Sequence, residues 1–177
     1  MIRTVRSNEL TESELHAIRR LLLECYDDDF ADEDWEHVLG GWHVLRYERG
    51  IPVSHASVVP RVLRTGGRKL RTGYVEAMAT HPEHRRRGFA GNVLVEVNKH
   101  IRREYELGAL SDGTEIDGFY QRHGWQVWFG ESSVDTPSGR VATPEEDGAI
   151  LVLTTPASAN LDLTAPITCD WRRGDVW

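Results

Sequence analysis

The order of segments along the chain predicts a mixed α/β fold (α+β) in one domain that spans residues 1–177. Segments rich in β-branched and aromatic residues, which favour strands, are interrupted by segments whose apolar residues recur with helical spacing. The chain has 177 residues, is 40% hydrophobic and shows no shift in composition along its length. It is therefore long enough for one substantial core and indicates no second domain.

A strand and then an amphipathic helix are predicted at the start of the chain. Residues 2–6 have the composition of a strand, and Thr11-Glu12-Ser13-Glu14 is typical of a capping box at a helix N-terminus. The apolar residues that follow share one helical face: Leu15, Ile18, Leu21, Leu22 and Cys25. This stripe runs into an acidic segment, residues 27–36, where seven of ten positions are Asp or Glu and two are aromatic.

The next part of the chain has strand character. Residues 42–49 and 51–63 are predicted to form a hairpin that turns at Gly50. Pro60 indicates a sheet edge or a bulge, because proline has no amide proton to donate. Gly66 and Gly67 predict the turn into a further strand that ends near Thr80.

The pattern changes to helical spacing after Pro82. The apolar face of this predicted helix comprises Phe89, Val93, Leu94, Val97 and Ile101. Gly108 is expected to end the helix. A short strand through Leu110, a helix carrying Phe119 and Tyr120, a turn at Gly124 and strands near 126–134 and 149–154 complete the predicted order. The tail, residues 160–177, has no predicted element.

Composition favours a cytoplasmic protein without membrane, metal or nucleic-acid partners. No run of 18 apolar residues is present, and the N-terminus lacks the layout of a secretory signal. Cys25 and Cys169 lie far apart, which fits a reduced protein better than a disulfide scaffold. His81 and His84 straddle a proline without cysteine partners, so no metal is expected. The net charge of -7 argues against nucleic-acid binding.

A strand, a loop and a helix start meet in residues 75–91, which contain the pattern Arg85-x-x-Gly88-x-Ala90. Amides at a helix N-terminus lack partners and lie at the positive end of the helix dipole, so small residues there let a pyrophosphate approach. This segment resembles the acetyl-CoA motif of the GNAT superfamily of N-acetyltransferases. The resemblance implies acetyl-CoA as co-substrate, with its pantetheine bonded by Met78, Ala79 and Thr80. The residues implied for the pyrophosphate are Arg85, Arg86, Arg87, Gly88, Phe89, Ala90 and Gly91.

A second motif lies downstream. Phe119-Tyr120 followed by Gly124-Trp125 resembles GNAT motif B, an aromatic pair on a helix followed by glycine and an aromatic residue. Together the two motifs imply the GNAT fold: a single mixed, mainly antiparallel central sheet with helices on both faces.

Acetyl transfer to an amine requires loss of a proton from nitrogen and, usually, protonation of the leaving thiolate. In the resemblance, Glu76 matches the base that acts through a water, Tyr120 matches the general acid, and the Met78 amide polarises the thioester carbonyl. An ordinary Glu pKa of about 4.3 is low for this base, so burial or a water relay has to help. A ping-pong route would instead acetylate Cys25 or Cys169, but neither lies beside the motifs and packing roles are preferred.

Further segments resemble the aminoglycoside 2'-N-acetyltransferases within this superfamily. They are residues 29–30, 34–37, 39–41, 73–76, 107–111 and 169–177, and the last run, with two tryptophans, is the most specific. Aminoglycosides are polycations, so their site needs several carboxylates. The resemblance implies an aminoglycoside substrate acetylated at a 2'-amine, and a homodimer. The implied substrate-binding residues are Asp29, Asp34, Glu76, Ala77, Ser111, Glu145, Glu146, Asp175 and Trp177 with its α-carboxylate.

The acceptor stays open at this point. Glu146, where relatives carry Asp, and Trp42, where they carry a smaller residue, leave the preferred aminoglycoside undecided. The alternatives are a GNAT enzyme for a polyamine, a cell-envelope amino sugar or another cellular amine, and a non-catalytic module that sequesters cations. The acidic segment alone is more typical of a solvated linker. The tail is expected to serve the site more than the core, so that removal of residues 175–177 leaves the fold intact.

Overall fold

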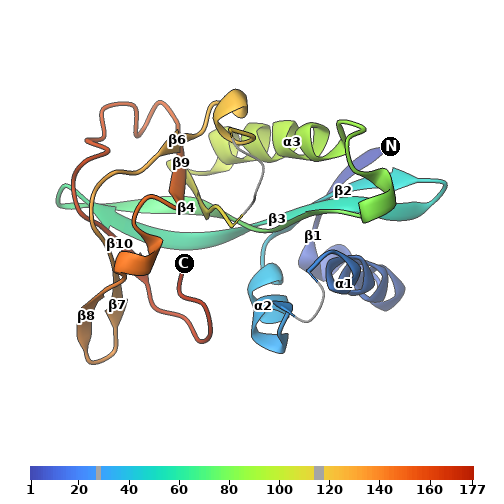
Figure 1. The fold of residues 1–177 in the computed structure, drawn as a ribbon, viewed down its shortest axis with the longest axis horizontal. Helices are drawn as coiled ribbons and strands as arrows, with labels where there is room; N and C mark the ends of the chain where they lie inside the picture. The colour runs from blue at the N-terminus through green and yellow to red at the C-terminus, as the bar shows by residue number, and fades with distance from the viewer. Residues whose placement is uncertain (27–28, 114–117) are drawn as a thin grey trace. The chain divides into compact units, whose positions relative to one another are not determined.

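The computed structural model describes residues 1–26, 29–113 and 118–177, and the chain divides into two compact units (Figure 1). Unit 1 comprises Met1–Val59 and Val75–Lys99, and unit 2 comprises Pro60–Tyr74 and His100–Trp177. Strands β3 (Ile51–Thr65) and β4 (Arg68–Thr80) and helix α3 (Phe89–Glu104) run from one unit into the other. Asp27 and Asp28 of the acidic segment lie outside the described residues.

Unit 1 is a small sheet with helices on both faces. Strand β1 (Ile2–Arg6) pairs antiparallel with β2 (Trp42–Glu48), and β2 pairs antiparallel with β3. Helices α1 (Glu12–Tyr26) and α2 (Asp32–Val38) cover one face and α3 the other (Figure 1). Two short 3-10 helices, η1 (Ser7–Glu9) and η3 (Pro82–His84), follow β1 and β4.

The predicted start and apolar face of α1 are confirmed. The Thr11 amide donates to the Glu14 carboxylate at 2.8 Å, and the Glu14 amide donates to the Thr11 hydroxyl at 3.3 Å, which is the capping box. Ile18 and Leu22 enter a core that also contains Val5, Leu10, Val38, Leu45 and Ala79. Burial of this face rather than helix propensity is what holds so short a helix in place.

Helix α2 was not predicted, because its seven residues are mostly acidic and resemble a solvated linker. The Ala31 amide donates to the Asp34 carboxylate at 2.8 Å, so an acidic residue stabilises the helix start. Val38, at the other end of α2, is buried in the core of unit 1.

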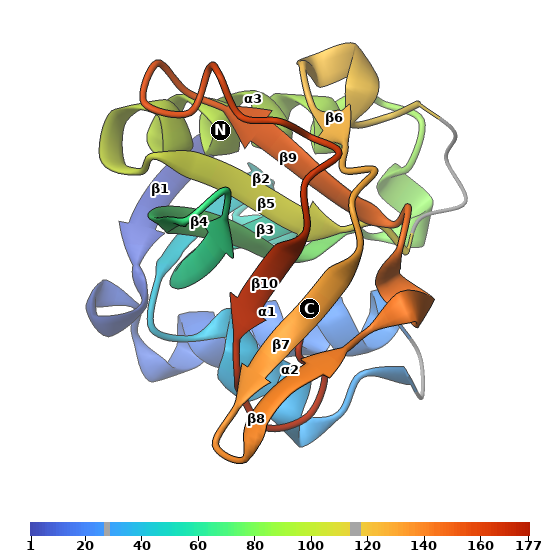
Figure 2. The ribbon, with the colours of Figure 1, turned by 90° about the vertical axis from the view of Figure 1, so that its left-hand side faces the viewer.

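Unit 2 contains the larger, mixed part of the same sheet, which β1 and β2 join through β3. Its strands are ordered β6-β9-β5-β4-β3-β10-β7-β8, and Figure 2 shows β10, β7 and β8 side by side. The strands first met here are β5 (Leu107–Ser111), β6 (Gln126–Val127), β7 (Ser132–Thr136), β8 (Gly139–Ala142), β9 (Ile150–Thr154) and β10 (Ile167–Asp170). The 3-10 helices η4 (Gln121–His123) and η5 (Pro144–Glu146) lie between them. Pairs β4·β5 and β10·β7 are parallel, whereas β5·β9, β6·β9, β7·β8 and β3·β10 are antiparallel, so the mixed, mainly antiparallel sheet is confirmed.

Several local predictions in unit 2 were wrong. Gly108 does not end α3: it lies inside β5, where a Cβ atom would come within 3.0 Å of the Leu153 side chain and 3.1 Å of Ile101. Phe119 and Tyr120 lie in a turn just before η4 rather than on a longer helix. The strand predicted near 126–134 is two strands, β6 and β7, and β8 and β10 were not predicted.

Candidate functional site

Four of the predicted substrate residues line one cavity of unit 1. Asp29, Asp34, Glu76 and Ala77 surround a space of about 190 Å³. Asp34 comes from α2, whereas Glu76 and Ala77 come from β4. The remaining wall is apolar or aromatic and consists of Tyr26, Phe30 and Val38. Three carboxylates around one small cavity favour a cationic ligand, because an amine there replaces its lost hydration with charge-assisted hydrogen bonds.

Tyr26 belongs to this cavity and was missed by the sequence analysis. Its hydroxyl donates to the Met78 carbonyl at 2.9 Å, and its ring stacks on Phe30 with centroids 5.8 Å apart. Burial raises the pKa of Tyr26, and the nearby Glu76 and Asp34 carboxylates raise that pKa further. The hydroxyl therefore stays protonated as a donor. The sequence does contain a signal for Tyr26, because this residue lies one helical turn after Leu22 and so continues the apolar face of α1.

The last part of β4 is held by side chains of unit 1. Ala77 has a positive φ of 47°, a left-handed conformation that is unfavourable for a residue with a Cβ atom. His55 hydrogen-bonds to the Ala77 carbonyl at 2.9 Å, and the Ser54 hydroxyl donates to the Ala79 carbonyl at 2.9 Å. Ser54 also lies 2.8 Å from the Thr80 hydroxyl. The strand that is expected to bond pantetheine therefore has an irregular backbone, and side chains of neighbouring residues hold that backbone by hydrogen bonds.

The loop expected to hold the pyrophosphate has the backbone shape of an anion site. Arg86 and Gly88 have positive φ values of 59° and 77°, and α3 begins directly after them at Phe89. Amides in the first turn of a helix have no intrahelical acceptor, so they can donate to an anion. The Arg85 amide is an exception among the seven predicted residues, because it donates to the Pro82 carbonyl at 3.3 Å.

Two guanidinium groups contact the ring of Phe89. Arg46 lies 4.5 Å and Arg87 lies 4.7 Å from the ring centroid. Glu48 pairs with both cations, at 2.6 Å from Arg46 and 3.9 Å from Arg87. Arg46 and Glu48 come from β2, far from the motif in sequence, so no local signal pointed to them. These cation–π contacts and ion pairs hold Phe89, the first residue of α3, in place.

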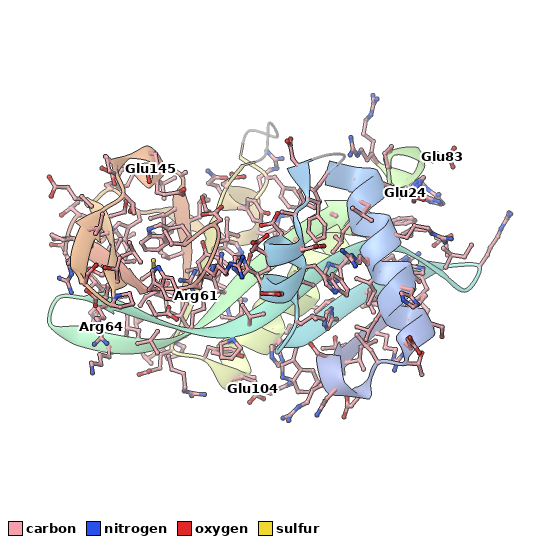
Figure 3. All side chains as sticks on the ribbon, turned by 90° about the horizontal axis from the view of Figure 1, so that it is seen from below. Glu24, Arg61, Arg64, Glu83, Glu104 and Glu145 are labelled. Carbon is pink, nitrogen blue, oxygen red and sulfur yellow. The ribbon has the colours of Figure 1, made fainter. Side chains whose placement is uncertain are left out.

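A second cavity of unit 1, of about 200 Å³, lies beside the start of this loop. Glu24 of α1 and Glu83 of η3 both line it and lie near each other in Figure 3. His81 lies 3.4 Å from the Glu24 carboxylate. The contact joins α1 to the residue that follows β4.

In unit 2, predicted substrate residues meet at the end of β5. The Ser111 hydroxyl donates to the Glu146 carboxylate at 2.7 Å. Burial raises the pKa of Glu146, and the carboxylates of Asp175 and Glu145 also raise it, against the opposing effect of the Ser111 hydrogen bond. Ser111, Glu145, Glu146 and Asp175 are therefore close enough to interact. A group of like charges of this kind is stabilised by a cation.

The C-terminal tail is folded onto unit 2. Trp177 is only 2% exposed, and its indole nitrogen donates to the Thr143 hydroxyl at 2.9 Å. Arg172 donates to the carbonyl of Asp175 at 2.6 Å and to the terminal oxygen of Trp177 at 2.9 Å. The expectation that the tail serves the site more than the core was therefore wrong for Trp177, whose side chain is part of the core.

Two arginines of β3 anchor the strands around this tail (Figure 3). Arg61 contacts the Asp170 carboxylate at 3.2 Å and the Asp170 carbonyl at 2.6 Å. Arg64 pairs with Asp135 of β7 at 3.1 Å. Burial makes the first of these contacts costly to lose, because Arg61 is 5% exposed.

Tyr120 lies in an aromatic cluster of unit 2. It is 3% exposed, with ring centroids 5.1 Å from Phe119 and 6.0 Å from Trp125. Its carbonyl accepts hydrogen bonds from the amides of His123 at 2.8 Å and Trp125 at 3.2 Å. These bonds and the left-handed Gly124 fix the backbone that carries the tyrosine.

The two cysteines are free thiols. Cys169 is buried, burial raises its pKa to about 11, and its thiol donates to the Val176 carbonyl at 3.3 Å. A neutral buried thiol is a poor nucleophile. Cys25 is partly buried and packs against the core of unit 1.

The described part of the chain contains no group of three or more His, Cys, Asp or Glu side chains arranged to hold a metal ion. Within the same residues, no helix is both long enough and apolar enough to cross a bilayer.

Comparison with solved structures places this fold among acetyltransferases. The match to the GNAT acetyltransferase YhbS of Escherichia coli in complex with CoA has a TM-score of 0.67, with 14% identity, 95% of this chain and 88% of that chain. The ribosomal-protein-S18-alanine N-acetyltransferase of Escherichia coli matches with a TM-score of 0.60, 15% identity and coverage of 92% and 99%. Eis1 from Mycobacterium abscessus matches 75% of this chain with a TM-score of 0.62 and 17% identity, and the chain spans only 33% of its length. At such identities the likeness concerns the fold alone.

Sequence comparison gives the family. A protein named aminoglycoside 2'-N-acetyltransferase from Mycolicibacterium fortuitum is 43% identical over 177 residues, covering 99% of this chain and 91% of the relative. The model of the acetyltransferase (GNAT) domain matches residues 6–128, a range that includes the loop before α3 and the aromatic cluster around Tyr120. The chain is an acetyltransferase and belongs to the GNAT family.

Proposed function

We propose that this acetyltransferase transfers the acetyl group of acetyl-CoA to the 2'-amino group of an aminoglycoside, by direct attack in a ternary complex, and so confers resistance to the antibiotic. The observation that carries the proposal is the cavity lined by Asp29, Asp34 and Glu76. Its three carboxylates suit an amino sugar that carries several ammonium groups. The name of the relative with 43% identity supports the same acceptor.

The co-substrate is assigned to β4 and to the loop that follows it. Met78, Ala79 and Thr80 lie on the irregular end of β4, where an acyl-pantetheine chain would run alongside the strand. The pyrophosphate is assigned to the loop 85–91, where Gly88 and the start of α3 make an anion site. The CoA complex of YhbS supports CoA as the ligand of this fold.

The reaction itself needs a base, an acid and a donor to the developing oxyanion. A water bonded to Glu76 removes one proton from the acceptor ammonium, and the nitrogen lone pair then attacks the thioester carbonyl carbon. The Met78 amide stabilises the negative charge on oxygen. When the C–S bond breaks, Tyr120 donates its hydroxyl proton to the departing sulfur, which leaves as CoA thiol. The nitrogen then gives its second proton to the Tyr120 phenolate, so that a neutral amide and a neutral tyrosine result.

The other predicted substrate residues, mostly carboxylates, lie in unit 2. Glu146, with Ser111 bonded to it and Asp175 and Glu145 nearby, is a second acidic group. Burial first, and then the neighbouring carboxylates, raise the pKa of Glu146; a cation bound beside it would favour the charged form of its carboxyl group. Trp177 contributes its carboxylate end only, because its side chain is buried.

The domain organisation, the compartment and the oligomeric state are also proposed. We take residues 1–177 as one acetyltransferase domain, because the relative aligns over 99% of the chain and β3 and β4 continue from one unit into the other. We place the enzyme in the cytoplasm, where acetyl-CoA is available. We also propose a homodimer, to be measured by sedimentation.

The test is release of CoA thiol by the purified protein with acetyl-CoA and two aminoglycosides that differ only at the 2' position. Kanamycin B carries a 2'-amino group and kanamycin A a 2'-hydroxyl group. Turnover with kanamycin B alone supports both the acceptor and the regiochemistry. Turnover with neither compound refutes the proposed acceptor, while the assignment to the GNAT family is unaffected.

The competing acceptor is a polyamine or another cellular amine. The fold permits it, since the likeness to an alanine N-acetyltransferase of a ribosomal protein shows that one architecture serves different amines. A kcat/KM for spermidine ten times that of every aminoglycoside would decide for this alternative. A module that only sequesters cations predicts ligand-dependent thermal stabilisation without any release of CoA.

A further inference from the structure

Unit 1 contains a chain of hydrogen bonds that leads from Ser7, directly after β1, to the end of β4. The Ser7 hydroxyl lies 2.8 Å from His43 Nε2, and His43 Nδ1 lies 3.0 Å from His55 Nε2. His55 Nδ1 lies 2.9 Å from the Ala77 carbonyl oxygen. Both imidazoles are fully buried. Neither histidine has a part in the mechanism proposed above.

The direction of every bond in this chain follows from its last member. A carbonyl oxygen only accepts, so His55 Nδ1 carries the proton. Burial lowers the pKa of His43 to about 4 and that of His55 to about 3, so both rings are neutral and each has one acceptor nitrogen. His55 Nε2 therefore accepts from His43 Nδ1, which leaves His43 Nε2 as an acceptor for the Ser7 hydroxyl 2.8 Å away; the same hydroxyl also lies 3.1 Å from the Gly41 carbonyl oxygen. Both imidazole donors point towards β4.

This chain cannot serve as a proton relay, because it ends on a carbonyl that does not pass a proton on. It can orient a peptide group. The Ala77 carbonyl and the Met78 amide belong to the same planar peptide, in which C=O and N–H point in opposite directions. Holding the carbonyl towards the buried His55 therefore aims the Met78 amide the other way, and a bonded carbonyl also makes that amide a stronger donor.

The conformation of Ala77 shows why such a hold is needed. Its φ of 47° is costly for alanine and persists only where surrounding groups fix it. The next two peptides of β4 are held in the same manner, since Tyr26 donates to the Met78 carbonyl and Ser54 to the Ala79 carbonyl, each at 2.9 Å. Three successive carbonyls are thus bonded to side chains.

We propose that His55, supported by His43 and Ser7, is a positioning residue that orients the Met78 amide towards the thioester oxygen of acetyl-CoA. The proposal rests on the proposed function only in taking acetyl-CoA to lie along β4. It does not depend on which amine is the acceptor.

Two substitutions at one position separate orientation from general packing. In His55→Asn, the side-chain amide nitrogen lies near the place of Nδ1 and can still donate to the Ala77 carbonyl. In His55→Gln, the longer side chain places its amide near Nε2, so the bond to the Ala77 carbonyl is lost while a polar contact with His43 is kept. Both variants lose the imidazole, so a purely structural role predicts similar behaviour for the two.

The Met78 amide can be observed directly. The chain has two methionines, and Met1 carries the terminal amino group, so a protein labelled with ¹⁵N-methionine gives one backbone amide signal, that of Met78. In the wild-type protein and in His55→Asn, we expect acetyl-CoA to shift this signal. In His55→Gln, we expect the signal to lie elsewhere in the free protein and to respond weakly to acetyl-CoA.

The matching kinetic expectation is a kcat that falls about 10- to 100-fold in His55→Gln and less than about fivefold in His55→Asn, because an oxyanion donor acts in the transition state. KM for the acceptor stays near its wild-type value in both. Equal kcat in the two variants, or an unmoved Met78 signal in a folded His55→Gln, overturns the proposal. If His55→Gln does not fold, His43→Leu breaks the chain one step back, and an unchanged Met78 signal in that variant overturns it equally.

Failure of the proposed function gives a different result. A wild-type protein whose Met78 signal responds to acetyl-CoA but which acetylates no aminoglycoside refutes the acceptor and leaves the role of His55 to be read from the labelled amide. An aminoglycoside acetylated by His55→Gln at the wild-type rate refutes the positioning role and supports the acceptor.

Discussion

Replacement of Trp177 by alanine is expected to destabilise the protein strongly, although the residue ends the chain. The side chain is 2% exposed and its indole nitrogen donates to Thr143 at 2.9 Å. Truncation of a buried tryptophan costs about 3–5 kcal/mol, and the lost hydrogen bond accounts for about 1 kcal/mol within that range. A typical domain has only about 5–15 kcal/mol of stability, so the change consumes a large part of it.

The assay is urea unfolding followed by far-UV circular dichroism, with the free energy of unfolding taken from the midpoint and slope. Trp171→Ala is the matched control, because this tryptophan lies in the same tail and is 49% exposed. Its replacement should change the free energy of unfolding by less than about 1 kcal/mol. Tryptophan fluorescence is avoided because both substitutions change it directly.

The buried packing of Trp177 is refuted if Trp177→Ala unfolds at the wild-type urea concentration, or if Trp171→Ala is the more destabilised of the two. Either result would mean that the tail is not packed as described. It would also restore the expectation that residues 175–177 can be removed without loss of fold.

Three further outcomes are expected. The free energy of unfolding should fall as pH drops from about 6.5, the ordinary His pKa, towards 4, because burial lowers the pKa of His43 and His55 and the unfolded chain then binds more protons. In a variant that lacks His43, acid unfolding should show a free energy that changes less steeply with pH, by up to about 1.4 kcal/mol per pH unit. Tyr120→Phe should lower kcat by roughly 10²- to 10⁴-fold with little change in acetyl-CoA affinity, measured by initial rates and calorimetry; unchanged turnover would remove its role as general acid. Since the pKa of Glu146 is raised, KM for an aminoglycoside should increase as pH falls through that pKa, and Glu146→Gln should flatten the profile; identical profiles would exclude Glu146 from the site.

Elements with a strong internal period were predicted well from the sequence. The apolar face of α1 and the face of α3 that includes Val93 and Val97 are buried as expected, because helical spacing alone brings those residues together. The capping residues Thr11 and Glu14 act within one turn, so their contact is also local.

Elements that depend on distant partners were not predicted. Strand β10 has four residues and exists because it pairs with β3 and β7. Gly108 was interpreted as a helix end, yet it is small because Leu153 packs against it. The same limit applied to the site: Asp29, Asp34 and Glu76 came from the resemblance, whereas Tyr26 and His55 contact carbonyls more than 20 positions away in the chain.

The sequence by itself determined the family of this protein, because the motifs that carry the resemblance consist of residue type and short spacing. The pyrophosphate loop and the cation-binding carboxylates are predictions that the resemblance implies. Only the tertiary structure decided that Trp177 is a core residue and that Arg46 and Arg87 both contact the ring of Phe89. It also decided that a pair of neutral histidines holds a strained peptide of β4. The physical reason is that burial and hydrogen-bond partners are set by segments far apart in the chain, and local sequence specifies only what each segment can form.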